Sequence, residues 1–178
     1  MATADDEILT GPRLILRPLR PTDADVVFFE VTSDDEVMRY LSCNTHSDVE
    51  QTRRFITELC MDDNNRGWII NWRSTGDPVG FCTWIRPEGP EVQLGISLGR
   101  RWWGQHVTSE ALDLLIEQAQ RDPSVHRVWA ACHVDNIGAA RALERNGLSM
   151  QDRLERYCVF PNLGAEPQDA FRFARTLR

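Results

Sequence analysis

"RRWWGQHVTSEAL" spans residues 100–112 and places two tryptophans, a glycine and a histidine directly before a segment with helical periodicity. A helix N-terminus has unpaired backbone N–H groups and a partial positive charge, so a loop that turns into it can bind phosphate. Gly104 would allow a close approach to the backbone, and Arg101 would add positive charge. The alternative is a tight strand–helix turn in which Trp102 and Trp103 cover the core, and the loop alone does not decide between the two.

The segments around this loop predict a strand–helix–strand–helix unit. Residues 91–99 have strand character, and the helix after the loop is expected to end at Asp122-Pro123. Residues 126–134 form the next expected strand, and residues 135–147 the next helix, which ends at Gly147. The long helix would carry Val107, Ala111, Leu114 and Leu115 on its apolar face and Glu110, Asp113, Glu117 and Gln120 on its polar face.

The remaining chain adds antiparallel strands to this unit. Residues 13–20 alternate apolar and basic side chains, and residues 67–86 surround a turn cluster, which indicates a hairpin. Two or three helices are expected between them, one capped by Thr22 and one begun by a capping box over residues 47–50. Two late strands are expected near 152–159 and 169–177. The pattern predicts an α/β (or α+β) domain of three layers, with a mixed sheet and helices on both faces.

Length and composition set outer bounds on the function. A chain of 178 residues fits a single domain, here expected over 11–178 after a flexible tail at 1–10. The net charge of −7 argues against a nucleic-acid partner. Five cysteines without a C-x-x-C spacing suggest reduced thiols in a cytoplasmic protein. No apolar run is long enough for a membrane span, and no secretion signal precedes the domain.

Several common chemistries lack their sequence signals. Cys132 and His133 are adjacent on an expected strand, so their side chains point to opposite faces and cannot form a nucleophile–base pair. The four histidines lack metal-ligand spacing, and neither a G-x-S-x-G nor a Walker-type loop occurs. The sequence therefore predicts no metal site and no hydrolase or nucleoside-triphosphate chemistry.

Three motifs together resemble the GNAT superfamily of acetyl-CoA-dependent N-acyltransferases, across residues 11–177. They are similar to the branch that contains the ribosomal-protein N-terminal alanine and serine acetyltransferases. The motifs are "RWWGQH" at 101–106, similar to the family's R-x-x-G-x-G/A loop, "DNIGAARALERNGL" at 135–148, and the opening "GPRLILRPLRPTDAD" at 11–25. The resemblance implies a GNAT fold that binds acetyl-CoA, without a metal.

By this resemblance the backbone amides of residues 102–108 would hold the pyrophosphate of coenzyme A. Ile96, Ser97 and Leu98 would pair with the pantetheine arm, and Asn136 would contact the cofactor from the second helix. The implied cofactor-binding residues in the loop are Arg101, Trp102, Trp103, Gly104, Gln105, His106, Val107 and Thr108.

The sequence departs from the family pattern at four positions. His106 stands where the loop ends in glycine or alanine, so donation from its backbone requires the dihedrals to stay helical. Ala139 and Leu143 replace a serine and a tyrosine that can donate to the departing thiolate. Gln93 replaces a strand glutamate and cannot act as a base.

Three residues are candidates for the chemistry. Glu91 and Gln93 project from the same strand face, so Glu91 could deprotonate an ammonium directly or through water while Gln93 orients a water or the amine. Tyr157 could protonate the thiolate. Gly95 marks either a strand bulge or a close ligand approach, and a distorted strand would free backbone N–H groups to polarise the thioester carbonyl. Two of them also have a purely structural interpretation: Glu91 as a solvated residue at the start of the strand, and Tyr157 as an aromatic side chain of the core.

The sequence thus predicts an N-acetyltransferase that moves an acetyl group directly from acetyl-CoA to an amine within a ternary complex. The acceptor would be a protein or peptide N-terminus, or a small amine, selected by groups on the early helices and the late loop. The alternative is a coenzyme A-binding protein with little catalysis, because three assisting groups are replaced. A free edge strand or exposed tryptophans could support a homodimer.

Overall fold

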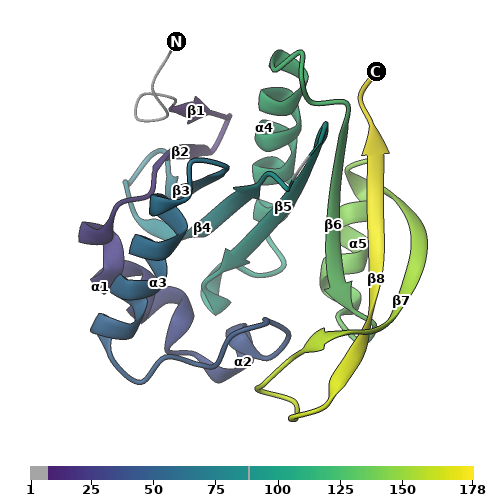
Figure 1. The fold of residues 1–178 in the computed structure, drawn as a ribbon. Coiled ribbons are helices and arrows are strands. Elements are labelled where there is room, and N and C mark those ends of the chain that lie inside the picture. Colours follow the sequence, from purple (N-terminus) through teal and green to yellow (C-terminus); the bar gives the residue numbers. More distant parts are fainter. Residues whose placement is uncertain (1–7, 88) are drawn as a thin grey trace.

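The computed structural model describes residues 8–87 and 89–178, which form one eight-stranded mixed sheet with helices on both faces (Figure 1). The strand order is β1-β2-β3-β4-β5-β6-β8-β7. The strands are β1 (Leu9–Thr10), β2 (Leu14–Pro18), β3 (Asn65–Trp72), β4 (Pro78–Ile85), β5 (Glu91–Leu98), β6 (Arg127–His133), β7 (Ser149–Val159) and β8 (Pro167–Thr176). The helices are α1 (Ala24–Val27), α2 (Asp35–Met38), α3 (Val49–Met61), α4 (Val107–Arg121) and α5 (Ile137–Arg145). The predicted three-layer α/β architecture is confirmed.

Each face of the sheet has its own apolar core. Helices α1 and α3 cover one face, where Ile56 packs against Ile69 and Phe81. Helix α4 covers the other face, and its Ala111 and Leu115 are fully buried there. Side chains of one strand alternate between these cores, so successive residues of β4 and β5 belong to different faces.

The sheet opens between its two parallel strands. β5 and β6 pair only from Glu91–Gln93 to Arg127–Trp129, and then diverge (Figure 1). β6 stays paired with β8 along its whole length, and β5 stays paired with β4 from Gln93 to Leu98. Beyond Gln93, β5 therefore has a strand neighbour on one side only, and its backbone groups on the other side face the opening.

Of the two interpretations of Gly95, a strand bulge or a close ligand approach, the bulge is wrong. The β4–β5 register runs without a shift from Gly80–Leu98 to Ile85–Gln93. Gly95 has a close neighbour instead: a Cβ there would lie 2.5 Å from Thr83 Oγ1 on β4, so the Thr83 side chain would have to turn. The backbone groups that a bulge was expected to free are instead freed by the divergence of β5 from β6.

The starts of two helical segments and of the folded domain differ from the sequence expectations. Helix α3 is capped by Asp48, whose carboxylate accepts from Gln51 N at 2.9 Å, so the N-cap lies one residue later than expected; the Gln51 side chain accepts from Ser47 N. Thr22 lies inside a 3-10 turn at Pro21–Asp23 and caps nothing. Leu9–Thr10 form β1, so the folded domain begins before residue 11, and the rest of the expected tail falls on residues 1–7, outside the described part, apart from Ile8.

Two irregular elements shape the region below the opening. After α1 the chain makes a π-helical turn at Phe28–Thr32, and β7 is irregular between Leu154 and Cys158. Four steps along β7 there match two steps along β8, from Ala170 to Gln168. Among the described residues, no helix is long and apolar enough to cross a membrane, and no three His, Cys, Asp or Glu side chains cluster as metal ligands.

Candidate functional site

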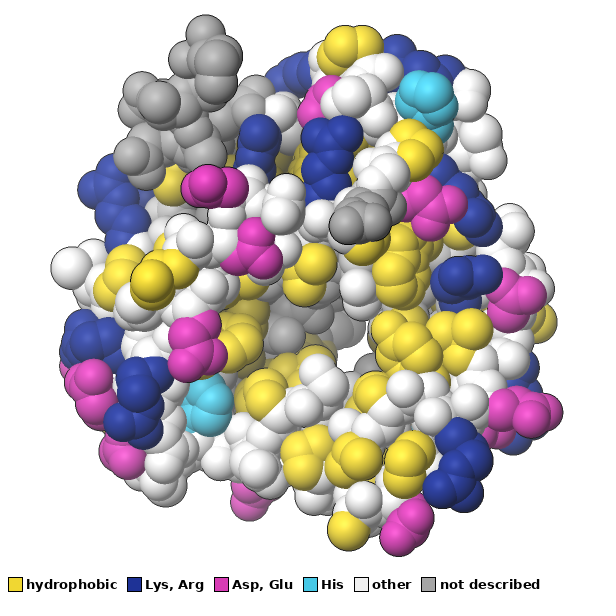
Figure 2. Space-filling view, viewed as in Figure 1, with side chains coloured by type: hydrophobic (Ala, Val, Ile, Leu, Met, Phe, Trp, Pro, Cys, Tyr) yellow, Lys and Arg dark blue, Asp and Glu magenta, His cyan; other side chains and the backbone are white. Residues whose placement is uncertain are grey.

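The divergence of β5 from β6 creates a cavity of about 590 Å³ that passes through the sheet. Figure 2 shows it as a hollow with hydrophobic side chains around it. A neighbouring cavity of about 470 Å³ shares Tyr40, Ile96, Ser97, Thr108 and Asn136 with the first and extends to Trp103 and Gly104. The two cavities thus form one channel, which leads from the loop before α4 to the region between α3 and β4.

The backbone of the loop before α4 has two left-handed residues. Gly104 has φ +75° and His106 has φ +59°, so the condition that the His106 dihedrals stay helical is not met. Trp102 N and Trp103 N donate within the loop, to Gly99 O and Arg100 O. In the described part of the chain, no hydrogen bond is donated by the backbone N–H groups of residues 104–109. The backbone N–H groups of the turn and of the first turn of α4 are therefore available to an anion.

The arginine and tryptophans of this loop hold it in place. The Arg101 guanidinium pairs with Glu30 at 2.7 Å, so it does not line the channel. Trp102 stacks on Trp72 with ring centroids 5.2 Å apart and packs on the core. Trp103 is 48% exposed, lines the channel and donates from Nε1 to Leu98 O at 3.0 Å.

The last residues of the loop also direct their side chains elsewhere. Gln105 Nε2 donates to Arg101 O at 2.8 Å, and His106 Nδ1 lies 3.2 Å from an Arg145 nitrogen on α5. Val107 is buried in the core below α4. Of the loop residues expected to bind the cofactor, only Trp103, Gly104 and Thr108 line the channel, and the others would contribute through the backbone or not at all.

An ion pair that sequence reasoning missed fixes this loop. The Glu110 carboxylate accepts from Arg13 N at 2.7 Å, Leu14 N at 3.0 Å and Arg13 Nε at 2.7 Å. The Arg13 guanidinium also donates to Gln105 O and His106 O. The carbonyl oxygens of Gln105 and His106 are thereby bound to Arg13. Arg13 and Glu110 are 97 residues apart, so no local pattern connects them.

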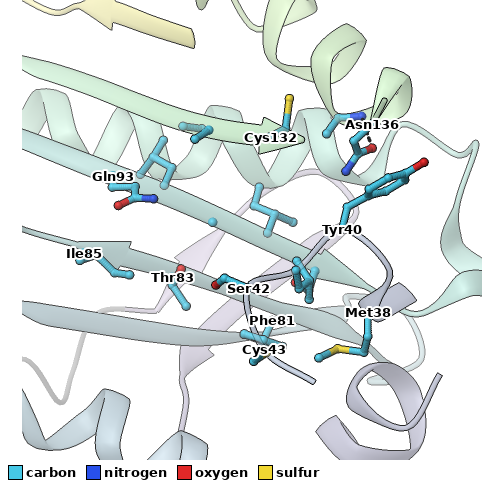
Figure 3. A pocket seen from close by; sticks show the side chains of 18 of the residues that line it. Met38, Tyr40, Ser42, Cys43, Phe81, Thr83, Ile85, Gln93, Cys132 and Asn136 are labelled. Carbon is cyan, nitrogen blue, oxygen red and sulfur yellow. Dashed lines mark hydrogen bonds between the residues drawn. The ribbon is translucent and has the colours of Figure 1, made fainter. Parts of the chain in front are cut away.

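The expected pantetheine-binding residues border the channel. Ile96, Ser97 and Leu98 lie on the open edge of β5, where no β6 residue is paired. Opposite them, Asn136 caps α5: its Oδ1 accepts from Ala139 N at 3.2 Å. Figure 3 shows Asn136 beside Tyr40 at one end of the cavity, and Gln93 with Ile85 at the other end.

Gln93 and Tyr157 meet at the far end of the channel. Both line the cavity, and Tyr157 belongs to the irregular part of β7, where Arg156 has φ +46°. A bulge redirects side chains, and here it brings Tyr157 to Gln93. Burial raises the pKa of Tyr157, as does the nearby Cys158, and the hydrogen bond with Gln93 partly offsets that rise. The phenol is therefore protonated at neutral pH and able to donate a proton.

Glu91 lies outside the lining of the cavity. Its carboxylate pairs with Arg127 Nη1 at 2.9 Å, where β5 and β6 are still joined. It shares a strand face with Gln93, as expected, but Gln93 alone of the two borders the cavity. The Glu91 carboxylate therefore does not face the cavity directly.

The segment of residues 38–43 forms a wall of the cavity and was not identified from the sequence as a site. Asn162 holds this segment: its Nδ2 donates to Met38 O at 2.8 Å and to Cys43 O at 2.9 Å. Tyr40 stacks on buried His133 with ring centroids 5.1 Å apart, and Phe160 contacts His133 edge-on. The segment after α2 and the loop that carries Phe160 and Asn162 therefore meet at this wall.

Comparison with known proteins identifies the fold and the chemistry. The acetyltransferase (GNAT) domain family matches residues 13–149. The uncharacterized N-acetyltransferase p20 of Bacillus licheniformis is 31% identical over 150 residues, which cover 82% of this chain and 83% of that protein.

Solved structures agree with the family match at the level of the fold. RimL, a ribosomal alpha-N-protein acetyltransferase in complex with coenzyme A, superposes with a TM-score of 0.85 at 18% identity, over 96% of this chain and 98% of that one. An acetyltransferase of Salmonella typhimurium that modifies the N-terminal serine of a ribosomal protein has a TM-score of 0.85 at 18% identity, over 97% and 100% of the two chains. The chain belongs to the GNAT acetyltransferase family, and it is an acyl-CoA-dependent N-acetyltransferase.

Proposed function

We propose that the chain transfers an acetyl group from acetyl-CoA directly to the α-amino group of a peptide or protein N-terminus, within a ternary complex. The observation that carries the proposal is the channel through the sheet, which connects the free N–H groups before α4 to a cavity without charged walls. The two ribosomal-protein acetyltransferases with similar folds modify protein N-termini, which supports an α-amino acceptor.

The structure fits coenzyme A at both ends of the channel. A Cβ at Gly104 would meet no atom within 4 Å, so the left-handed turn leaves open space in front of the free amides. The diphosphate would bind there, since N–H groups and the helix dipole both favour an anion. The pantetheine arm would lie along the open edge of β5 at Ile96–Leu98 and past Asn136. Bound acetyl-CoA would supply the reactive thioester.

Direct transfer is favoured because the cavity offers no activated thiol. Cys43, Cys132 and Cys158 line it. Burial raises the pKa of all three thiols, that of Cys132 to about 11. A thiol in that state is almost fully protonated at neutral pH and is a poor nucleophile. An acetyl-cysteine intermediate on any of them would therefore form slowly.

In the proposed step, the neutral amine nitrogen attacks the thioester carbonyl carbon, the C–S bond breaks, and the amine loses one proton to water. Backbone N–H groups on the open edge of β5 would stabilise the carbonyl oxygen as it gains charge. Tyr157 would give its proton to the departing thiolate and regain one from solvent. Gln93 would orient the amine or a water, and Glu91 would act only through that water.

The cavity favours an α-amine over an alkylamine. Among the described residues that line it, none is Asp, Glu or His, so no side chain can take the proton of a bound ammonium directly. An α-amino group has a pKa near 8 and is roughly one quarter neutral at pH 7.5, whereas a lysine-type amine is only about 0.1% neutral. The acceptor's own pKa should therefore govern the reaction.

The test is thiol release from acetyl-CoA with dipeptide amides between pH 6 and 9, with mass spectrometry of the product. We expect kcat/KM to rise with pH, to be half-maximal near the pKa of the acceptor, about 8, and to level off about one pH unit above it. Glu91→Gln should keep this profile and lose less than about threefold in kcat. Exposed Glu117→Gln on α4 is the matched control.

Two outcomes would contradict the proposal. A loss of about 10² or more in Glu91→Gln, with the acid limb abolished, would identify Glu91 as a direct general base. Saturable binding of coenzyme A without release of thiol to any amine would argue against N-terminal acetylation altogether.

A further inference from the structure

Apolar side chains line the acceptor side of the channel, which is the part between α3 and β4. The side chains come from several elements: Met38 from α2, Phe55 and Leu59 from α3, Phe81 and Ile85 from β4, and Leu41 from the segment after α2. These six residues are here called the acceptor pocket: Met38, Leu41, Phe55, Leu59, Phe81 and Ile85. They lie on the sheet face opposite α4, whereas the loop that would bind the diphosphate lies at the start of α4.

The aromatic side chains of the acceptor pocket are fixed by their neighbours. The Phe55 ring packs edge-on against Phe81 with centroids 5.9 Å apart, and against His46 at the same distance. Phe81 is almost fully buried, while Phe55 is only partly buried. Since both rings are held in place, the pocket presents a preformed apolar surface, which binds apolar groups at little cost in ordering.

The polar groups behind this surface are already satisfied. Thr32 Oγ1 and Thr52 Oγ1 are hydrogen-bonded at 2.7 Å, and Thr52 Oγ1 bonds His46 Nδ1 at 2.8 Å. Burial lowers the pKa of His46, so this imidazole is neutral at pH 7. The described lining of the cavity holds hydroxyls, thiols and amides but no ionised side chain. A charged acceptor side chain would lose its hydration here and gain no counter-ion.

We infer that the acceptor pocket binds a large apolar side chain, aliphatic or aromatic, on the residue whose α-amine is acetylated. The inference depends on the proposed function, since it names the first residue of the peptide that function requires. It also separates this chain from an enzyme that selects a serine, because a small hydroxyl side chain would leave this apolar surface in contact with water. Polyamines and aminoglycosides, which carry several positive charges, are excluded by the same walls.

The test uses the purified full chain, acetyl-CoA and dipeptide amides X-Ala that differ only at X. All of them have an α-amine of similar pKa, so differences report on the side chain. We expect kcat/KM for Leu, Met and Phe at X to exceed that for Ser, Asp and Lys by about tenfold or more. Equal or faster acetylation of Ser, Asp or Lys would overturn the inference but leave the proposed function standing. Acetylation of no dipeptide would overturn the proposed function itself.

Two variants locate the effect. Phe55→Ala should lower the Leu-to-Ser ratio of kcat/KM at least threefold, whereas Phe29→Ala, at a ring that is 72% exposed and outside the cavity, should leave the ratio unchanged. Ser42 is an exposed residue that lines the cavity beside Thr83 (Figure 3). Ser42→Asp adds a carboxylate with little risk to folding, and should raise the Lys-to-Leu ratio about tenfold. An unchanged ratio in both Ser42→Asp and folded Phe55→Ala would place the acceptor elsewhere and overturn the inference.

Discussion

His106 is the residue at which this chain departs most clearly from the loop of its family, and the backbone explains what the departure costs. The family pattern has glycine or alanine there, and in this chain the position has φ +59° and ψ +22°. A left-handed conformation costs a residue with a Cβ about 1 kcal/mol or more. His106 keeps that conformation while its carbonyl accepts from Arg13 and its ring lies beside Arg145.

The backbone therefore predicts an unusual order of stability at this position. His106→Gly should be more stable than His106→Ala by about 1 kcal/mol, although alanine is the better residue inside a helix. Urea unfolding of the two variants measures the difference directly. Wild-type Gly138, an ordinary residue of α5, and its variant Gly138→Ala are the comparison: there the alanine protein should be the more stable. An alanine at 106 as stable as the glycine would mean that the turn is not left-handed in solution.

At the scale of single residues, the sequence could point to candidate residues whose expected role follows from neighbouring residues in the chain. Gly104 and Asn136 follow from a loop before a helix and from a helix cap, and the structure places both on the channel. Arg13 and Asn162 could not be found in this way. Their partners, Glu110 and residues 38–45, are about 100 residues distant and meet them only in the folded sheet.

The strand pair β4–β5 is the element on which the site depends, since it presents Gln93 and Ser97 to the channel. Gly80 allows its close approach: a Cβ there would lie 2.1 Å from Ser97 O and 2.8 Å from Leu98 Cα, both backbone atoms. The ladder cannot relieve such an overlap by turning a side chain, so one strand would have to move.

Gly80→Ala should therefore destabilise the protein by about 3 kcal/mol or more and lower activity in parallel. Gly138→Ala is the matched control, because its Cβ would meet no atom closer than 3.9 Å and α5 gains a better helix former. The control should be neutral or up to about 1 kcal/mol more stable. Thermal unfolding of the two variants gives the comparison, and a Gly80→Ala protein as stable as wild type would show that β4 and β5 are farther apart than described.

At the scale of elements, periodicity predicted the regular segments and failed at the irregular ones. Helix α4 and strand β6 were expected close to their observed bounds. The apolar residues of α4 recur at helical spacing, and β6 is a short apolar run, residues 128–132, between polar ends. The π-helical turn at Phe28–Thr32 and the bulge that carries Tyr157 have no such period. The divergence of β5 from β6 has no local signal either, so the backbone groups that it frees were expected from a bulge at Gly95 instead.

The whole molecule consists of two half-sheets that the β5–β6 pair joins over only three residues on each strand. Helix α4 and its loop run across this junction, and Arg13 links the loop to β2 on one side while His106 contacts α5 on the other. A ligand in the channel would contact both halves at once. Binding should therefore stabilise the molecule as a unit, and not only its loop.

Coenzyme A at about 100 times its Kd should add about 2.7 kcal/mol to the free energy of unfolding and raise Tm by roughly 5–10 °C. ATP and NAD, which lack the pantetheine arm, should give a much smaller shift. Gly104→Ala and Gly76→Ala form a matched pair, since both glycines have φ near +76° and open space around an added Cβ. Each substitution should cost about 1 kcal/mol without ligand. Only Gly104→Ala should also weaken the shift by coenzyme A, because its methyl group would stand before the free amides. Equal shifts in the two variants would place the diphosphate away from this turn.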